Sequence, residues 1–327
     1  MTSSILPLSA DTYQVHPIHA TERIWTETNC YVDVWIEVLH SLRLDPLAAA
    51  AFTLSTDFEG DQWTFFKYPP EDLRRAYGID VHEMNPWRGV LQHVTEQLRL
   101  GRFLTMETNS YYLPDTAGVS YQIDAVKSTI VPNLVDVEKR RLGYFHNAGY
   151  FELEGTDFDG VFGVGEGSGS AALPPYVEII RMERMTQRSH DETTEIALGL
   201  LADHIAQRPR DNPVARMAER IATDVAWLQA NSLEAFHLWA FGTLRQCGAS
   251  SQMAAAFCRW LAERTGGCPE LTEAAAHWDA LAGSAKSLQF VLARVARGRN
   301  AEFGSTLASM AQDWDLAQAM SARAVGL

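Results

Sequence analysis

Cysteine is scarce in this sequence. The 327 residues contain four cysteines, Cys30, Cys247, Cys258 and Cys268, unevenly spaced and without a CxxC pair. This pattern argues against a disulfide framework and against a zinc knuckle. Basic residues are also few, because 27 Lys and Arg face 41 Asp and Glu, for a formal net charge of −14. A surface of that sign repels phosphate backbones, so we expect no nucleic-acid partner.

Long hydrophobic runs are absent as well. No apolar stretch approaches the ~20 residues that a membrane helix needs, and the start of the chain lacks the basic and apolar regions of a signal peptide. We therefore expect no membrane segment and a cytoplasmic location. Hydrophobic residues make up 46% of the chain and charged residues 21%, which is typical of a folded protein. The length favours two structural units over one.

The first half of the chain mixes helical and strand patterns. Residues 29–42 predict a helix that Asn29 caps, with apolar side chains around most of its circumference and a narrow polar stripe at Asp33, Glu37 and Ser41. A second helix is expected over 90–100. Strands are expected over 103–107, 128–134, 141–145 and 176–181. The second and third of these strands read as an antiparallel hairpin, and the glycine-rich stretch 160–175 reads as a loop.

From about residue 190 the pattern becomes helical almost without interruption. Asn212 with Pro213 opens one helix and Ser232 opens another. Further helices are expected over 253–261, 271–295 and 303–322. The sequence thus predicts an α+β domain over residues 1–188 and a helical-bundle domain over 189–327.

Cys30 would lie in the first turn of the predicted helix 29–42. Unpaired backbone N–H groups and the helix dipole stabilise a thiolate there, and a thiolate attacks ester, amide or thioester carbonyls. The alternative is an inert thiol in the core, because free cysteine is among the most buried residue types.

A cysteine nucleophile also needs a base and a group that orients the base. His146 ends a predicted strand and is followed by Asn147, which can hold an imidazole; the alternative is a histidine satisfied in a turn. His16 and His19 form an HxxH pair, but no further metal ligands can be placed beside them. No metal site is therefore predicted.

Two loops rich in acidic and aromatic residues are candidates for a substrate pocket. They are DFEGDQWTFF, with Asp57, Asp61 and Trp63, and YYLPDTAG, with Tyr112 and Asp115. Neither loop has the ligand spacing of a calcium site. Ordinary surface loops are the alternative reading.

The segments TETNCYVDVWIEVLHSLRLDP, DFEGDQWTFF, YYLPDTAGVSYQ and KSTIVPNLVDVEKRRLGYFHNAGYFELEG together resemble a bacterial family of unknown function. More remotely, they are similar to the butirosin-pathway aminoacyltransferases and to papain-like bacteriocin-processing peptidases. The resemblance implies a papain-like cysteine-transferase core in which Cys30 is the nucleophile and Asn29 and Tyr112 belong to matching motifs. Where those relatives place a catalytic histidine, this chain has Lys127-Ser128-Thr129.

That departure leaves three alternatives open: His146 acts as the base from a different strand, Lys127 does so, or the triad is broken. The resemblance implies transfer of an acyl or aminoacyl group from the phosphopantetheine thioester of a carrier protein, through Cys30, to a small acceptor. No cofactor is expected beyond the phosphopantetheine that the partner carries. An acidic carrier protein would need a basic patch, for which the clusters 139–141 and 74–75 are candidates. The second hypothesis is a non-catalytic binding or scaffold protein.

Overall fold

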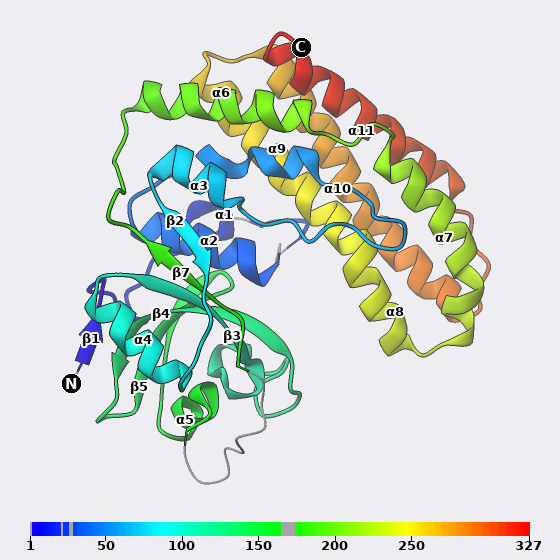
Figure 1. The fold of residues 1–327 in the computed structure, drawn as a ribbon. Helices are drawn as coiled ribbons and strands as arrows, with labels where there is room; N and C mark the ends of the chain where they lie inside the picture. The colour runs from blue at the N-terminus through cyan, green and yellow to red at the C-terminus, as the bar shows by residue number, and fades with distance from the viewer. Residues whose placement is uncertain (1, 21, 26–28, 165–173) are drawn as a thin grey trace. The chain divides into compact units, whose positions relative to one another are not determined.

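The computed structural model describes the chain except for residues 1, 21, 26–28 and 165–173 (Figure 1). Packing divides it into two units. The first comprises Met1–Thr21, Asn29–Pro46 and Pro70–Gln187, and the second comprises Glu22–Thr28, Leu47–Pro69 and Arg188–Leu327. The second unit therefore includes segments that lie before residue 70.

The first unit is built on an antiparallel sheet. Its strands are β1 (Thr2–Ser4), β2 (Asp80–Glu83), β3 (Phe103–Asn109), β4 (Lys127–Asp136), β5 (Arg141–His146), β6 (Gly149–Glu154) and β7 (Val177–Arg181). The order across the sheet is β2-β7-β3-β4-β5-β6, and β1 pairs with β4. The predicted hairpin is the β4–β5 pair, and the class is mixed α+β as expected.

Helix α2 (Cys30–Ser41) lies on one face of this sheet (Figure 1). The Asn29 side chain accepts a hydrogen bond from the backbone N–H of Val32 at 2.8 Å, which is the predicted cap. Most of α2 is buried, in agreement with its nearly continuous apolar surface. The other helices of this unit are α1 (Pro17–Ala20), α3 (Pro70–Tyr77), α4 (Val90–Arg99) and α5 (Thr156–Phe162).

One expectation for this half needs correction, and one strand of the hairpin region was not predicted. The predicted loop 160–175 starts inside α5, because that helix extends to Phe162; residues 165–173 lie outside the described part of the chain. The pattern also gave no signal for β6, whose residues Gly149–Glu154 pair with β5 across a tight turn.

The second unit is helical. It contains α6 (His190–Ala206), α7 (Pro213–Ala230), α8 (Leu233–Ala240), α9 (Gln246–Arg264), α10 (Pro269–Ala296) and α11 (Gly304–Ala324), with a π-helical turn over Phe241–Arg245. The predicted caps Asn212 and Ser232 begin α7 and α8. Among the described residues, no helix combines the length and the apolar composition that a membrane crossing requires.

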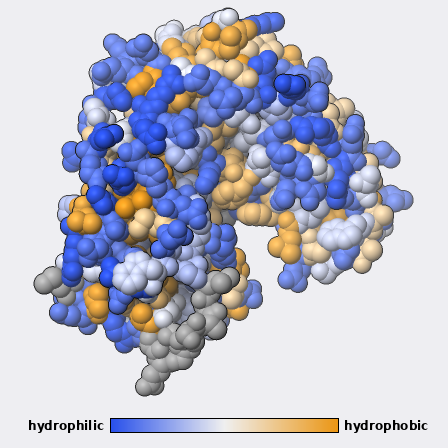
Figure 2. All heavy atoms as spheres, in the orientation of Figure 1, coloured by the Kyte–Doolittle hydropathy of each residue, from blue (hydrophilic) through white to orange (hydrophobic). Residues whose placement is uncertain are grey.

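An early segment of the chain packs into this helical unit. The Trp25 indole N–H donates to the Ala282 carbonyl at 3.1 Å, and its ring lies so close to α9 that a Cβ at Gly248 would approach it to 2.4 Å. On the face of the molecule shown in Figure 2, hydrophilic residues predominate and hydrophobic residues form small groups.

Candidate functional site

Three side chains of the first unit form a continuous hydrogen-bonded chain. The Ser128 hydroxyl lies 2.6 Å from His146 Nε2, and His146 Nδ1 lies 2.5 Å from Asp115 Oδ2. The Tyr144 hydroxyl donates to the other oxygen of Asp115 at 2.5 Å. We refer to Ser128, His146 and Asp115 as the relay.

Each relay residue is held by a different element. Ser128 is the second residue of β4, and His146 is the last residue of β5. Asp115 belongs to a short 3-10 turn (Pro114–Thr116), which the Thr116 hydroxyl fastens by donating to the Leu113 carbonyl at 2.9 Å. The relay therefore joins a loop to two neighbouring strands.

The position of Asp115 determines which nitrogen of the His146 ring carries the proton. A carboxylate at Nδ1 keeps the proton on that nitrogen, so that Nε2 presents its lone pair to the Ser128 O–H. Burial and the neighbouring Asp115 raise the pKa of Tyr144, which remains a neutral donor. This is the arrangement of a Ser-His-Asp triad. His146 is 1% exposed and Ser128 8%, so the bonds lie where the dielectric is low and hydrogen bonds are strong.

Cys30 occupies the position that the sequence predicted, as the first residue of α2. Its side chain is neither fully buried nor fully exposed, whereas Cys247 and Cys258 are buried. Burial raises the pKa of Cys247 to a range in which that thiol stays protonated. Cys30 is therefore less buried than Cys247 and Cys258, and it lies at a helix N-terminus.

The side chains beside Cys30 identify the face of the sheet that α2 covers. The Tyr31 hydroxyl donates to Glu178 Oε2 of β7 at 2.5 Å, and the Thr105 hydroxyl of β3 donates to the same oxygen at 2.9 Å. Thr105 and Glu178 are paired across the two strands. Both side chains therefore project toward α2.

His146 projects from the opposite face. Met106 follows Thr105 on β3 and so points away from α2, because successive side chains alternate. Met106 pairs with Ile130 of β4, and Ile130 pairs with His146 of β5. The imidazole thus lies in the row that faces away from α2. The structure does not bring His146 together with Cys30, and the predicted roles of base and nucleophile fall on opposite faces of one sheet.

Asn147 is not seen holding the imidazole. It lies in the turn between β5 and β6 with a φ of 45°, a left-handed conformation that asparagine tolerates better than most residues. Both His146 nitrogens are occupied instead by Ser128 and Asp115. Asp115, which the sequence placed among the pocket residues, is the group that orients the ring.

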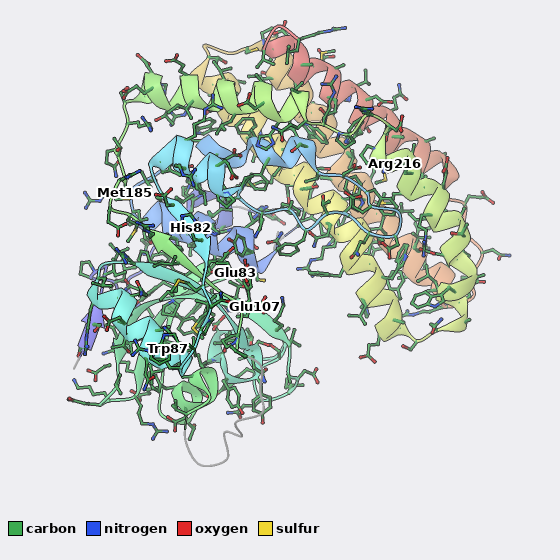
Figure 3. The ribbon with its side chains drawn as sticks, in the orientation of Figure 1. His82, Glu83, Trp87, Glu107, Met185 and Arg216 are labelled. Atoms are coloured by element: carbon green, nitrogen blue, oxygen red, sulfur yellow. The ribbon has the colours of Figure 1, made fainter. Side chains whose placement is uncertain are left out.

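Lys127 lies on the face that α2 covers. It pairs in register with Asn109, two positions beyond Glu107 on β3, and its ammonium donates to Glu107 Oε1 at 2.6 Å. The lysine side chain is 73% exposed. Glu83 of β2, paired with Glu178, extends this carboxylate-rich row; Figure 3 labels Glu83 and Glu107.

The HxxH histidines are part of a hydrogen-bonded cluster with α2. His19 places Nε2 3.2 Å from Asp33 Oδ1 and Nδ1 against Glu37. The backbone N–H of His16 donates to Glu37, and so does the Tyr13 hydroxyl, at 2.6 Å. Both nitrogens of His19 are thereby engaged by carboxylates, which leaves no lone pair for a metal.

The remaining predicted pocket residues are divided between the two units. Asp57 forms an ion pair with Arg216 of α7, which is labelled in Figure 3. The Trp63 indole N–H donates to the Met217 sulfur at 3.1 Å. These two residues fasten a loop to the helical unit. Tyr112, in the first unit, packs its ring over Gly160, where a Cβ would approach it to 2.1 Å.

Two family models match the chain, one in each half of the sequence. The DUF1839 N-terminal domain matches residues 14–182, and the DUF1839 C-terminal domain matches residues 190–322. The chain belongs to the DUF1839 family. This is a family of unknown function, as the sequence indicated. None of the curated proteins matches the chain. In this DUF1839 chain, both the relay and Cys30 fall within the N-terminal domain.

Sequence reasoning missed Ser128 as a partner of His146. The signal was present, because both residues lie near the open end of the predicted β4–β5 hairpin. Ile130 pairs with His146, and Ser128 is two positions before Ile130 on the same strand. Side chains two apart on a strand share a face. A register for the hairpin would have placed Ser128 and His146 together.

Proposed function

We propose that this DUF1839 chain catalyses acyl transfer through an ester on Ser128, with His146 as the general base and Asp115 as the residue that orients it. One observation supports the proposal above the others: Ser128, His146 and Asp115 are joined in the triad order at 2.6 and 2.5 Å. That order is recognised by geometry and not by sequence position.

The chemistry follows from the tautomer. Ser128 Oγ attacks the acyl carbonyl carbon while its proton passes to His146 Nε2. The bond from the carbonyl to the donor's sulfur or oxygen then breaks, and the imidazolium returns the proton to that leaving group. In the second half, an amine, alcohol or water attacks the Ser128 ester and gives its proton to Nε2. The bond from the carbonyl carbon to Ser128 Oγ then breaks, and the imidazolium returns the proton to that oxygen.

The loop that precedes Ser128 exposes apolar side chains that suit an acyl donor. Val126, two residues before Ser128, is 51% exposed, and Ile123 in the same loop is 59% exposed. Exposed apolar side chains of this kind bind acyl chains by removing them from water. A surface pocket of about 410 Å³ borders the acidic end of the relay at Asp115, with Pro114 and Phe151 in its wall.

For the donor we propose an acyl or aminoacyl carrier protein, which presents its acyl group as a phosphopantetheine thioester, and for the acceptor a small molecule. The resemblance to the butirosin-type transferases motivates this assignment. Of the basic cluster 139–141, Arg140 pairs with Asp159 and Arg141 pairs with Glu152. We therefore assign the contact with an acidic carrier protein to Lys139. Lys139→Glu is expected to weaken carrier binding.

A second candidate route uses a thioester on Cys30. Its support is the half-open thiol at the N-terminus of a buried helix that packs against an antiparallel sheet, as expected for a papain-like transferase. On that face Lys127 and Glu107 would have to move the proton that a histidine moves in the relatives. The Ser128 route is preferred because its base is already in place.

Variant kinetics test the proposal. Hydrolysis of short acyl esters and of acyl-pantetheine thioesters is measured for the wild type and for Ser128→Ala, His146→Gln and Asp115→Asn. We expect kcat to fall by about 10³- to 10⁴-fold in each, because the relay acts as a unit. Ser120→Ala is the matched control, since Ser120 is a buried serine of the same unit whose hydroxyl donates to the Thr116 hydroxyl at 3.0 Å.

Three outcomes separate the alternatives. Loss of turnover in the relay variants with Cys30→Ala unaffected supports the Ser128 route. Loss in Cys30→Ala alone overturns it in favour of the cysteine route. Carrier-protein binding without turnover of any acyl donor would overturn both and indicate a scaffold protein.

A further inference from the structure

A second cavity lies entirely within the helical unit. Its volume is about 630 Å³, in the range of small-molecule sites. It is lined by residues of α7, α8, the π-helical turn and one loop: Asp61, Gln62, Arg220, Asp224, Trp227, Ala235, Leu238, Trp239 and Gly242. Two indole rings and two carboxylates thus face the same space.

Hydrogen bonds fix the inner wall of the cavity. The Trp239 indole N–H donates to Asp224 Oδ2 at 2.9 Å, and Arg220 Nε donates to Asp224 Oδ1 at 2.7 Å. Both oxygens of Asp224 are therefore occupied, and Arg220 is already paired with it. The ring of Trp239 is held in place by its own N–H bond.

The opposite wall is a loop that the π-helical turn holds. The Gly242 carbonyl accepts the Trp63 backbone N–H at 2.9 Å, which anchors the loop beside Asp61. Single π-helical turns occur frequently at functional sites. Within the described ranges the Asp61 carboxylate has neither a hydrogen bond nor an ion pair, and Trp227 is 47% exposed.

We propose that this cavity binds a small organic ammonium ion. Indole faces attract cations through their quadrupole, and a carboxylate adds a full charge. An anionic ligand is disfavoured, because Arg220 is neutralised by Asp224 while Asp61 remains unpaired. The assignment concerns the C-terminal unit alone and does not depend on the acyl-transfer proposal.

Choline and its neutral isostere, in which carbon replaces the charged nitrogen, provide the test. The two probes have nearly the same shape, so a difference in affinity measures recognition of the charge. Titrations of the full chain are followed by calorimetry and by tryptophan fluorescence. Choline is expected to bind saturably, and about tenfold or more tightly than the isostere.

Variants assign the binding to this cavity. Trp227→Leu and Asp61→Asn are each expected to weaken choline binding about tenfold. Two exposed residues provide matched controls: Trp87→Leu, at a tryptophan of the first unit, and Asp191→Asn, at the start of α6, are expected to leave binding unchanged. Equal affinities for choline and the isostere, or binding that survives both cavity substitutions in a variant with wild-type circular dichroism, would overturn the assignment.

Discussion

His19 lies between two carboxylates of α2, and its side chain is only 1% exposed. Burial lowers the pKa of His19, but the hydrogen bonds that its ring donates to Asp33 and Glu37 outweigh burial and raise that pKa above 6.5. Burial likewise raises the pKa of Glu37, but the bonds from His19 and Tyr13 outweigh burial and lower it below 4.5. In the folded state, hydrogen bonds therefore favour the charged forms of His19 and Glu37, although burial alone would favour their neutral forms.

The direction of these shifts fixes the pH dependence of stability. A raised histidine pKa contributes stability that is fully present below 6.5 and is lost as the pH rises through the folded-state value. A lowered glutamate pKa contributes stability that is present above 4.5 and is lost as the pH falls. The cluster therefore stabilises the fold most between these two values.

His19→Gln is predicted to reduce the free energy of unfolding by about 3 kcal/mol at mildly acidic pH, because it leaves two carboxylates buried without a cation. The reduction should shrink as the pH rises well above neutrality. Urea unfolding at mildly acidic pH and at a pH well above neutrality measures the reduction in the free energy of unfolding. His277→Gln, which removes a partly exposed pair with Asp313, is the control. An equal loss for His19→Gln at both pH values would contradict the charged state of the cluster.

For individual residues, the sequence identified most members of the candidate site but not which side chains contact one another. Cys30, His146 and Asp115 were each singled out, but their pairing depends on which face of the sheet each side chain meets. That in turn depends on strand register, which periodicity alone leaves open. The polar stripe of α2 was recognised, whereas the Tyr13–His19 segment that covers it carries no regular pattern.

At the scale of elements, α2 depends on its first turn. Asn29 is 3% exposed and is the N-cap of α2, which begins at Cys30. Asn29→Ala is predicted to cost about 1 kcal/mol of stability, and Asn29→Asp to restore most of it, because aspartate accepts the same backbone N–H. Chemical denaturation of the two variants measures the difference. Equal losses for alanine and aspartate would show that the cap bond is not what stabilises this end.

Elements with a cap or a strong alternation could be predicted, and short ones could not. Helices α2, α7 and α8 carry Asn29, Asn212 and Ser232 as signals, and the β4–β5 hairpin has clear strand runs. Strand β6 combines Tyr150 and Phe151 with Glu at two of its six positions, and α5 contains Gly160, so neither has a clear local signal. Pairing with β5 and packing against Tyr112 define these two elements instead.

At the scale of the whole molecule, the two packing units are not two continuous halves of the chain. Residues Leu47–Pro69 belong to the helical unit, where the Gln318 side chain donates to the Leu54 carbonyl at 2.6 Å and Ser55 bonds to His204 at 2.8 Å. A boundary near residue 188 follows the change from mixed to helical pattern. It does not reveal that an early segment completes the later unit.

A fragment of residues 189–327 is therefore predicted to be less stable than the helical unit in the full chain. It lacks Phe58 and Trp63, two buried aromatic side chains whose loss costs about 3–6 kcal/mol. Thermal unfolding followed by circular dichroism measures the loss, and addition of a peptide of residues 47–69 should reverse part of it. A fragment that melts cooperatively at the same temperature with or without the peptide would contradict the division.

The central claim is that Ser128 is an activated nucleophile, and covalent trapping with a fluorophosphonate tests it most directly. Intact mass and peptide mapping locate the adduct after a short incubation of the wild type, Ser128→Ala, His146→Gln and Cys30→Ala. The relay predicts one adduct, on Ser128, that persists in Cys30→Ala and disappears in the other two variants. A wild-type protein that stays unlabelled, or labelling of Ser128 that does not depend on His146, would contradict it.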